Sequence, residues 1–339
     1  MKALMQHRLA WPLLTLALLL AVNAVFNPGF LHLEWREGHL YGSLIDILNR
    51  AAPLILVSLG MTLVIATRGI DISVGAVVAI SAAVAAWTIG GNVDGSARFG
   101  VPWAIAAAVG VALLCGLWNG VLVAGVGMQP IIATLILMVA GRGVAQLITD
   151  GQILTIYHKP FFFVGGGYWL GLPFSLFVVA AVYGVLHLAA KRSALGLFLQ
   201  AVGINPSAAR VAGVQARRLV LGAYAVCGLC AGLAGVLISS NIKSADGNNA
   251  GQLLELDAIL AVTLGGTLLT GGRFSLLGSV IGALIIQTLT YAIYSLGVPP
   301  EINLVVKAVV VFAVMLLQSP EFRAMLRTLA VRPAAGSVR

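Results

Sequence analysis

Long apolar segments separated by short polar breaks run through most of the chain. Runs of about 17–25 apolar residues are long enough for an α-helix to cross the hydrocarbon core of a bilayer. Ten candidate spans follow this pattern, near residues 9–27, 52–67, 72–90, 101–126, 130–148, 172–190, 219–239, 254–270, 274–294 and 303–318. The pattern predicts an all-α polytopic membrane protein with about ten transmembrane helices.

Glycine positions indicate that these helices pack closely and that some are broken or re-entrant. The chain holds 40 glycines, and pairs spaced four residues apart allow two helices to approach closely in lipid. Such pairs occur at Gly116/Gly120, Gly228/Gly232 and Gly278/Gly282. The stretch 52–90 is compatible either with two spans or with one broken helix.

Composition excludes a soluble protein and a nucleic-acid-binding one. The chain is 60% hydrophobic and 9% charged, whereas soluble domains carry about 25% charged residues. The outer surface must therefore face the lipid bilayer. The net charge of +9 includes no dense basic patch interleaved with aromatic residues, so it does not indicate nucleic acid as a partner. The N-terminal apolar run is interpreted as the first membrane helix, because further spans follow it.

Basic residues predict the orientation of the spans. Two of the 20 lysines and arginines, Arg142 and Lys307, fall within spans. With a cytoplasmic N-terminus, only five lie in outer loops, and the remaining thirteen lie on the cytoplasmic side. The five are Arg36, Arg50, Arg98, Lys159 and Lys243. The positive-inside rule then predicts an even number of spans with both termini cytoplasmic.

No signature of a catalytic site is present. The sequence has no phosphate-binding G-x-x-x-x-G-K-[ST], no H-E-x-x-H and no G-x-S-x-G, so an enzyme and a bound cofactor are not expected. Cys227 and Cys230 form C-x-x-C inside an apolar run. We interpret them as small residues at a helix contact.

Polar residues inside the spans mark candidates for a transport path. Arg142 lies in the span 130–148 with Gln146 one turn later, and an intramembrane arginine normally faces a partner or a water-filled path. Glu255 and Asp257 are its candidate partners. We expect Arg142, Gln146 and Glu255 to line an outer vestibule, although interhelical hydrogen bonding or snorkelling also accounts for them. Further polar points are Asn119, and Lys307 with Asn303.

Residues 67–78, TRGIDISVGAVV, place charges between two apolar runs. Arg68 and Asp71 fall at a cytoplasmic turn in the predicted topology, where a charge can reach the interface. Asp71 would favour the free N–H groups that begin the next helix, and Gly69 and Gly75 would permit the turn and close packing. The alternative is a broken helix whose Arg68, Asp71, Ser73 and Gly75 border the translocation path.

The same stretch has a weak internal counterpart. Residues 68–79 align with 271–282, pairing Gly69 with Gly272 and Gly75 with Gly278. The predicted topology gives both pieces the same direction, whereas transporter repeats are often inverted. The similarity therefore reflects either a repeat or chance.

The cytoplasmic segment 191–218 is the longest and most basic loop. Ser207 is expected to cap a short helix that runs through Ala212 and stops at Gly213. The small side chains of Ala208, Ala209 and Ala212 would let this helix lie deep in a groove of another protein. A solvated connector is the alternative, but such a helix would carry Glu, Lys or Gln at these positions.

Three stretches resemble the ABC importer permeases of the ribose and branched-chain amino acid group. The loop matches the pattern G-x-N-x-x-A-A-x-x-A-G, carried here by Gly203, Asn205, Ala208, Ala209, Ala212 and Gly213. GIDISVG, residues 69–75, is similar to the sugar-permease motif G-I-D-L-S-V-G. LELDAILAVTLGGTLLTGGRFSLLGSVIGALI resembles the C-terminal family signature. Within the family, ILNRAAP, LILMVAGRGVAQLIT and LELDAILAV are most similar to permeases of galactofuranose importers.

This resemblance implies a function, a domain organisation and a set of partners. The chain would be one permease domain, 1–339, with a coupling loop at 191–218 and a basic cytoplasmic tail at 319–339. It would reside in the bacterial inner membrane and import a sugar delivered by a periplasmic binding protein. A separate, tandem ATPase would hold ATP and Mg²⁺, and a paralogous second permease would complete the path.

Two alternatives remain open at this level. A permease of the same family could carry ribose, another sugar or an amino acid. A secondary transporter driven by an ion gradient would use Arg142, Glu255 and Asp257 as a charge relay. That second alternative leaves the alanine-rich docking face of the basic loop unexplained.

Overall fold

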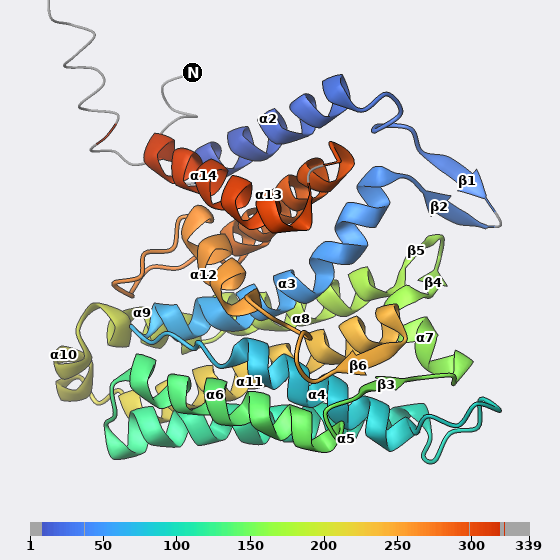
Figure 1. Ribbon diagram of the computed structural model, residues 1–339. Helices are drawn as coiled ribbons and strands as arrows, with labels where there is room; N and C mark the ends of the chain where they lie inside the picture. Colours follow the sequence, from blue (N-terminus) through green and yellow to red (C-terminus); the bar gives the residue numbers. More distant parts are fainter. Residues whose placement is uncertain (1–8, 37, 298, 319–321, 323–339) are drawn as a thin grey trace, which may run out of the picture.

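The computed structural model describes residues 9–36, 38–297, 299–318 and 322, and it is mostly helical (Figure 1). The helices are α2 (Ala10–Phe26), α3 (Ser43–Ala66), α4 (Val74–Ile89), α5 (Val101–Gly120) with its π-helical continuation η1 (Val121–Val126), α6 (Pro130–Ile148), α7 (Lys159–Gly166), α8 (Phe174–Arg192), α9 (Leu195–Ile204), α10 (Pro206–Val211), α11 (Ala216–Ile242), α12 (Leu254–Leu264), α13 (Leu276–Ser295) and α14 (Pro300–Gln318).

Three short antiparallel strand pairs accompany the helices. β1 (Glu34–Arg36) pairs with β2 (His39–Tyr41), and β4 (Tyr168–Trp169) pairs with β5 (Leu172–Pro173). β3 (Ile153–Thr155) pairs with β6 (Ser244–Asp246), which joins two loops that are distant in sequence. All three pairs lie at one end of the bundle, whereas α9 and α10 lie at the other (Figure 1).

Each of the ten predicted spans contains a helix, but the helices differ in length. Six of them are long and apolar enough to cross a membrane among the described residues: α3, α5 with η1, α6, α8, α11 and α13. α2 and α4 are shorter, and α12 has only 11 residues. The stretch 52–90 is therefore two helices, α3 and the short α4, joined by the break 67–73.

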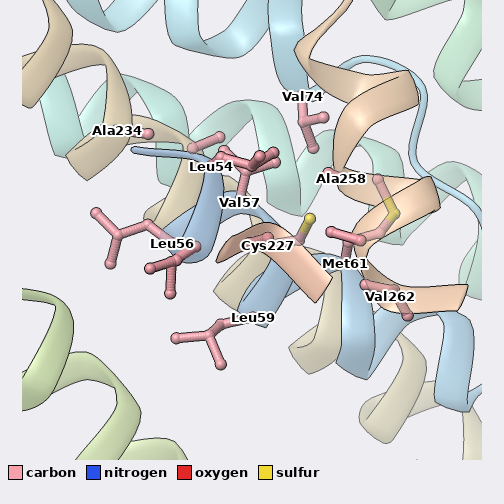
Figure 2. Packing of buried hydrophobic residues seen from close by; sticks show 14 of the residues in the cluster. Leu54, Leu56, Val57, Leu59, Met61, Val74, Cys227, Ala234, Ala258 and Val262 are labelled. Carbon is pink, nitrogen blue, oxygen red and sulfur yellow. The ribbon is translucent and has the colours of Figure 1, made fainter. Parts of the chain in front are cut away.

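The core is built around α3. Its residues from Ala51 to Ala66 are buried with the exception of Pro53, because the helix is surrounded by α11, α13, α12 and α8. Figure 2 shows Leu54, Val57 and Met61 of α3 packed among side chains of α4, α11 and α12. An α-helix that is apolar on every side is stable only when protein or lipid surrounds it.

The predicted glycine contacts are confirmed. Gly116 of α5 lies against Gly228 of α11, and Gly278 of α13 lies against Gly265 at the end of α12. A Cβ atom at any of these positions would overlap the backbone of the neighbouring helix. Close backbone approach of this kind is how helices associate in lipid, where no hydrophobic driving force acts between them.

Two long helices are each followed by a break and a short buried helix. α3 leads through 67–73 into α4, and α11 leads through 243–253 into α12. Both breaks follow the C-terminal ends of their long helices, but they lie at opposite ends of the bundle, one beside α9 and one containing β6 (Figure 1). The aligned stretches 68–79 and 271–282 lead into α4 and α13, and their relation as an internal repeat stays a prediction.

Candidate functional site

The docking helix α10 forms where the sequence predicts it, with a different cap. Asn205, not Ser207, is its N-cap residue, and the Asn205 Oδ1 atom accepts the backbone N–H groups of Ser207 and Ala208 at 3.1 and 3.0 Å. Pro206 occupies the first helical position, where its missing N–H has no consequence. Gly213 follows the helix with φ +84°, which permits the chain to leave it.

One exposed face of α10 is apolar and small, and the exposed Ser207 and Arg210 lie beside it. Ala208 and Ala212 are exposed, and the side chain of Val211 is 91% exposed. Ala209 points the other way and is buried within this chain. The expected docking face therefore consists of Ala208 and Ala212 together with Val211, which sequence reasoning missed. Its signal was a valine in a loop where a solvated helix would carry a charged residue.

The segment just before α10 is fixed to the helix bundle. Gly203, near the end of α9, packs so tightly on Ala66 and Gly272 that a Cβ atom would overlap both. The guanidinium group of Arg68 donates from Nε to the Gly203 carbonyl at 2.5 Å and from Nη2 to the Ile204 carbonyl. Arg68, expected along the path, is thus placed beside the docking helix.

Asp71 lies inside the bundle, and the expected position at an accessible turn is wrong. It is 2% exposed, because the chain turns back into the protein after Arg68. Its Oδ1 atom accepts the N–H and the hydroxyl of Ser73 at 3.0 and 2.6 Å, and the Asn119 amide at 3.3 Å. Asn119 also donates to the Ser73 hydroxyl at 2.8 Å. These three path candidates form one buried hydrogen-bonded group at the start of α4.

The beginnings of α4 and α12 meet in the middle of the bundle. Gly75 of α4 lies against the Gly251 carbonyl, where a Cβ atom would stand 2.5 Å from the oxygen, and would overlap the Glu255 carboxylate. Glu255 is 4% exposed, and its Oε2 atom has no hydrogen-bond partner among the described residues. The Glu255 side chain thus lies where the N-terminal ends of two short helices meet.

Arg142 and Gln146 of α6 hold the break before α12. Arg142 Nη1 donates to the Ala250 carbonyl at 2.6 Å and to the Gly247 carbonyl at 3.4 Å, and Gln146 donates to Asn248 Oδ1 at 2.5 Å. Backbone carbonyls need such donors wherever the chain is not helical at membrane depth. Arg142 and Gln146 therefore both bind the non-helical segment before α12.

Asp246, at the outer end of the same break, stays ionised. Burial raises the pKa of its carboxyl group, but hydrogen bonds from Asn249 and Asn248 and the charge of Arg142 outweigh burial and lower the pKa overall. The carboxylate of Asp246 thus holds the first turn of the break together by accepting hydrogen bonds from Asn248 and Asn249.

Asp257 does not pair with Arg142, contrary to expectation. Its Oδ2 atom lies 2.5 Å from Nζ of Lys307, and the two side chains are 23% and 14% exposed. This ion pair joins α12 to α14, so each charge has its partner at membrane depth. Asn303 belongs to α14, and its side chain is outside the described residues.

A cleft of about 810 Å³, with both polar and apolar walls, opens at the end of the bundle that carries the strand pairs. Its lining includes Asp46, Asn49, Arg50, Asn241 and Gln287. Sequence reasoning placed no site here, because these residues come from three helices that are separate in sequence, α3, α11 and α13.

A family model described as "Branched-chain amino acid transport system / permease component" matches residues 43–315. That segment contains every group of residues described above, from the start of α3 into α14. The chain belongs to this permease family. Its members are transporter components, and the permease is accordingly a multi-pass membrane protein that is not itself catalytic.

Three curated relatives named for sugar transport match this permease over almost their whole length. The galactofuranose transporter permease protein YtfT of Escherichia coli is 49% identical over 95% of this chain and 94% of its own. The fructose import permease protein FruF of Bifidobacterium longum is 37% identical over 94% and 90%. The ribose import permease protein RbsC of Escherichia coli is 34% identical over 91% and 92%. No solved structure matches the chain.

Proposed function

We propose that this permease is a transmembrane subunit of an ATP-driven importer for a sugar, galactofuranose. The observation that carries the proposal is the 49% identity to a galactofuranose transporter permease across 95% of the chain. The fructose and ribose permeases match over similar lengths at 37% and 34%. The exposed apolar face of α10 supports an ATP-driven mechanism, because it offers a binding surface for a partner ATPase.

The proposed assembly has four kinds of subunit. A tandem ATPase binds ATP and Mg²⁺ and contacts α10 on the cytoplasmic side. A periplasmic binding protein delivers the sugar to the opposite end, where the strand pairs lie. A paralogous permease completes the path, and both chains are embedded in the bacterial inner membrane.

The proposed path runs along the face where the break 243–253 reaches the surface. Asn248, Asn249 and Gln252 are exposed there, next to the partly buried Gln146. Irregular backbone with amide side chains is tolerated at membrane depth only against protein or water. A neutral sugar needs hydrogen bonds without a permanent counter-charge, which matches amides. Arg142 and Glu255 support this face from inside the protein. The position at which α4 begins is fixed by the buried residues Asp71, Ser73, Gly75 and Asn119.

A second permease is needed to close this face. α6 exposes Ile132, Leu135 and Val139, and α14 exposes Val305, Val309 and Phe312. The Arg142 side chain joins α6 to the break before α12, and the ion pair of Lys307 with Asp257 joins α14 to α12 itself. We propose that a paralogous copy of the permease packs there. Asn303 of α14, a further path candidate, has its side chain outside the described residues.

The proposed topology retains about ten transmembrane helices in one domain, 1–339, and α4 and α12 are the short helices that begin at breaks inside the bundle. α10 within the loop 191–218 faces the cytoplasm, and both termini lie on that side. The basic tail 319–339 lies outside the described residues apart from Phe322.

The test is transport by the purified complex in proteoliposomes. We expect galactofuranose uptake to require the ATPase, ATP and the binding protein, and to be competed poorly by ribose or fructose. Uptake that persists without ATP but follows an imposed ion gradient would instead establish a secondary transporter. Efficient competition by ribose or fructose would reassign the sugar within the family.

A further inference from the structure

Three chain segments that are far apart in sequence meet beside the docking helix. They are the end of α3 with residues 66–68, the end of α9 with 203–204, and the loop 271–272 before α13. The Gly272 N–H donates to the Ala66 carbonyl at 2.9 Å. Gly203 touches both of the other segments and leaves no space even for a methyl group. Because no free space remains at this junction, a movement of α9 must also displace the two segments that Gly203 contacts.

Arg68 closes this junction from one side. Its backbone has φ +66°, a conformation that a non-glycine residue adopts only when its surroundings hold it. The side chain reaches the carbonyls of Gly203 and Ile204, the last two of α9. These groups have no intrahelical partner and carry the negative end of the helix dipole, so a guanidinium group suits them. Ile204 is followed directly by Asn205, the cap of α10.

The other side of Arg68 leads into the centre of the bundle. Residues 69–71 connect it to the buried group of Asp71, Ser73 and Asn119, and Tyr224 donates to the Ile70 carbonyl at 3.3 Å. α4 begins immediately afterwards, and its Gly75 lies against Gly251 in the second break. A continuous chain of close contacts thus joins α10 to both breaks.

We infer that Arg68 is a positioning residue that transmits movement of the docking helix α10 to the break before α4. The inference rests on the proposed function, since it assigns a part in coupling ATP hydrolysis to transport. Arg68 touches neither the sugar nor ATP. Its role is to make the end of α9 and the start of the break move as one body, so that hydrolysis on the partner subunit shifts α4.

The experiment compares Arg68→Ala, Arg68→Lys and Arg273→Ala in the complete complex in proteoliposomes. Arg273 is an exposed arginine in the neighbouring loop on the same side, which makes it the matched control. Galactofuranose uptake and ATP hydrolysis are measured together, and their ratio is the readout. We expect Arg68→Ala to retain hydrolysis while sugar moved per ATP falls roughly tenfold, the effect of losing one charge-assisted contact. Lysine keeps the charge but cannot serve both carbonyls, so Arg68→Lys should restore only part of the ratio.

A second readout needs no sugar. Hydrogen exchange of the amides at 203–209 in the assembled complex should accelerate in Arg68→Ala and remain unchanged in Arg273→Ala. An uptake-to-hydrolysis ratio in Arg68→Ala equal to that of the control would overturn the inference. Failure of both Arg68 variants to assemble would also overturn it, since Arg68 would then be a folding residue. Absence of ATP-driven uptake in the wild-type complex would instead refute the proposed function.

Discussion

At the scale of single residues, side chains that look alike in the sequence take different roles according to depth. Arg68 and Arg142 are both flanked by or close to glycine in apolar surroundings, and both donate to backbone carbonyls. One holds the end of α9, and the other holds the break before α12. In each case, the charge replaces hydrogen bonds that a helix would have made within itself.

Removing Arg142 should loosen the break it holds. Arg142→Ala leaves the Ala250 carbonyl without its donor, at about 1–3 kcal/mol for a hydrogen bond to a charged group. We expect a lower melting temperature and strongly reduced uptake in proteoliposomes. Arg98→Ala, in the outer loop over Trp87, is the control and should retain uptake. Unchanged stability and uptake in Arg142→Ala would refute a role for this residue at the path.

Gly75 should not tolerate any side chain. A methyl group there would overlap the Glu255 carboxylate and the Gly251 carbonyl, so Gly75→Ala should destabilise the protein by about 1–3 kcal/mol through overpacking. Gly184→Ala on α8 meets nothing within 4 Å and should be neutral or stabilising by about 0.5–1 kcal/mol, because alanine favours a helix. Thermal unfolding in detergent compares the two, and equal melting temperatures would contradict the contact.

At the scale of elements, α10 depends on a cap that lies outside the helix itself. Asn205→Ala removes the acceptor for two backbone N–H groups, a loss of about 0.5–2 kcal/mol. We expect weaker binding of the partner ATPase by the variant. Ser207→Ala is the matched comparison, and it should bind like the wild type. The reverse order of effects would restore Ser207 as the cap.

The exposed face of α10 should be sensitive to charge. Ala212→Glu or Val211→Asp places a carboxylate in the proposed contact with the ATPase, and burying an unpaired charge is strongly unfavourable. We expect uptake to be lost while the permease still folds, as judged by its melting temperature. Thr270→Glu, exposed in the loop 265–275, controls for added charge. Full ATP-dependent uptake in Ala212→Glu would rule out this face.

At the scale of the whole molecule, the two breaks place the beginnings of two short helices inside the bundle. α4 and α12 start inside the protein, and their positive ends converge near Glu255. The break before α12 also brings amide side chains to the surface at membrane depth. The fold thereby creates a polar face without interrupting the long helices that carry the core.

This face should be reachable by water. The three native cysteines are first replaced, and Asn248→Cys or Gln252→Cys is then introduced. Each new thiol should react with a membrane-impermeant thiol reagent added outside. Galactofuranose in the presence of the binding protein should slow the reaction. Val185→Cys lies on the exposed side of α8, which should contact lipid, and it should stay unlabelled. Equal labelling at all three positions would argue against a defined aqueous path.

Sequence alone determined the class and the helices of this protein. Apolar runs fix spans because the bilayer leaves no other way to satisfy the backbone. Glycine spacing predicted that helices pack closely at Gly116 and Gly228, because the small residue itself permits the approach, and the structure shows that these two glycines meet. The loop pattern also located α10, since its glycine and its small residues act through local chain geometry.

Tertiary structure alone decided which polar residues meet. Asp71 was expected near the membrane surface, and it is buried, because the chain turns back after Arg68 to join Ser73 and Asn119. Asp257 was a candidate partner of Arg142, yet Lys307 is nearer once α14 packs on α13 and α12. A side chain's partner depends on how separate helices dock, and no local pattern of residues encodes that distance.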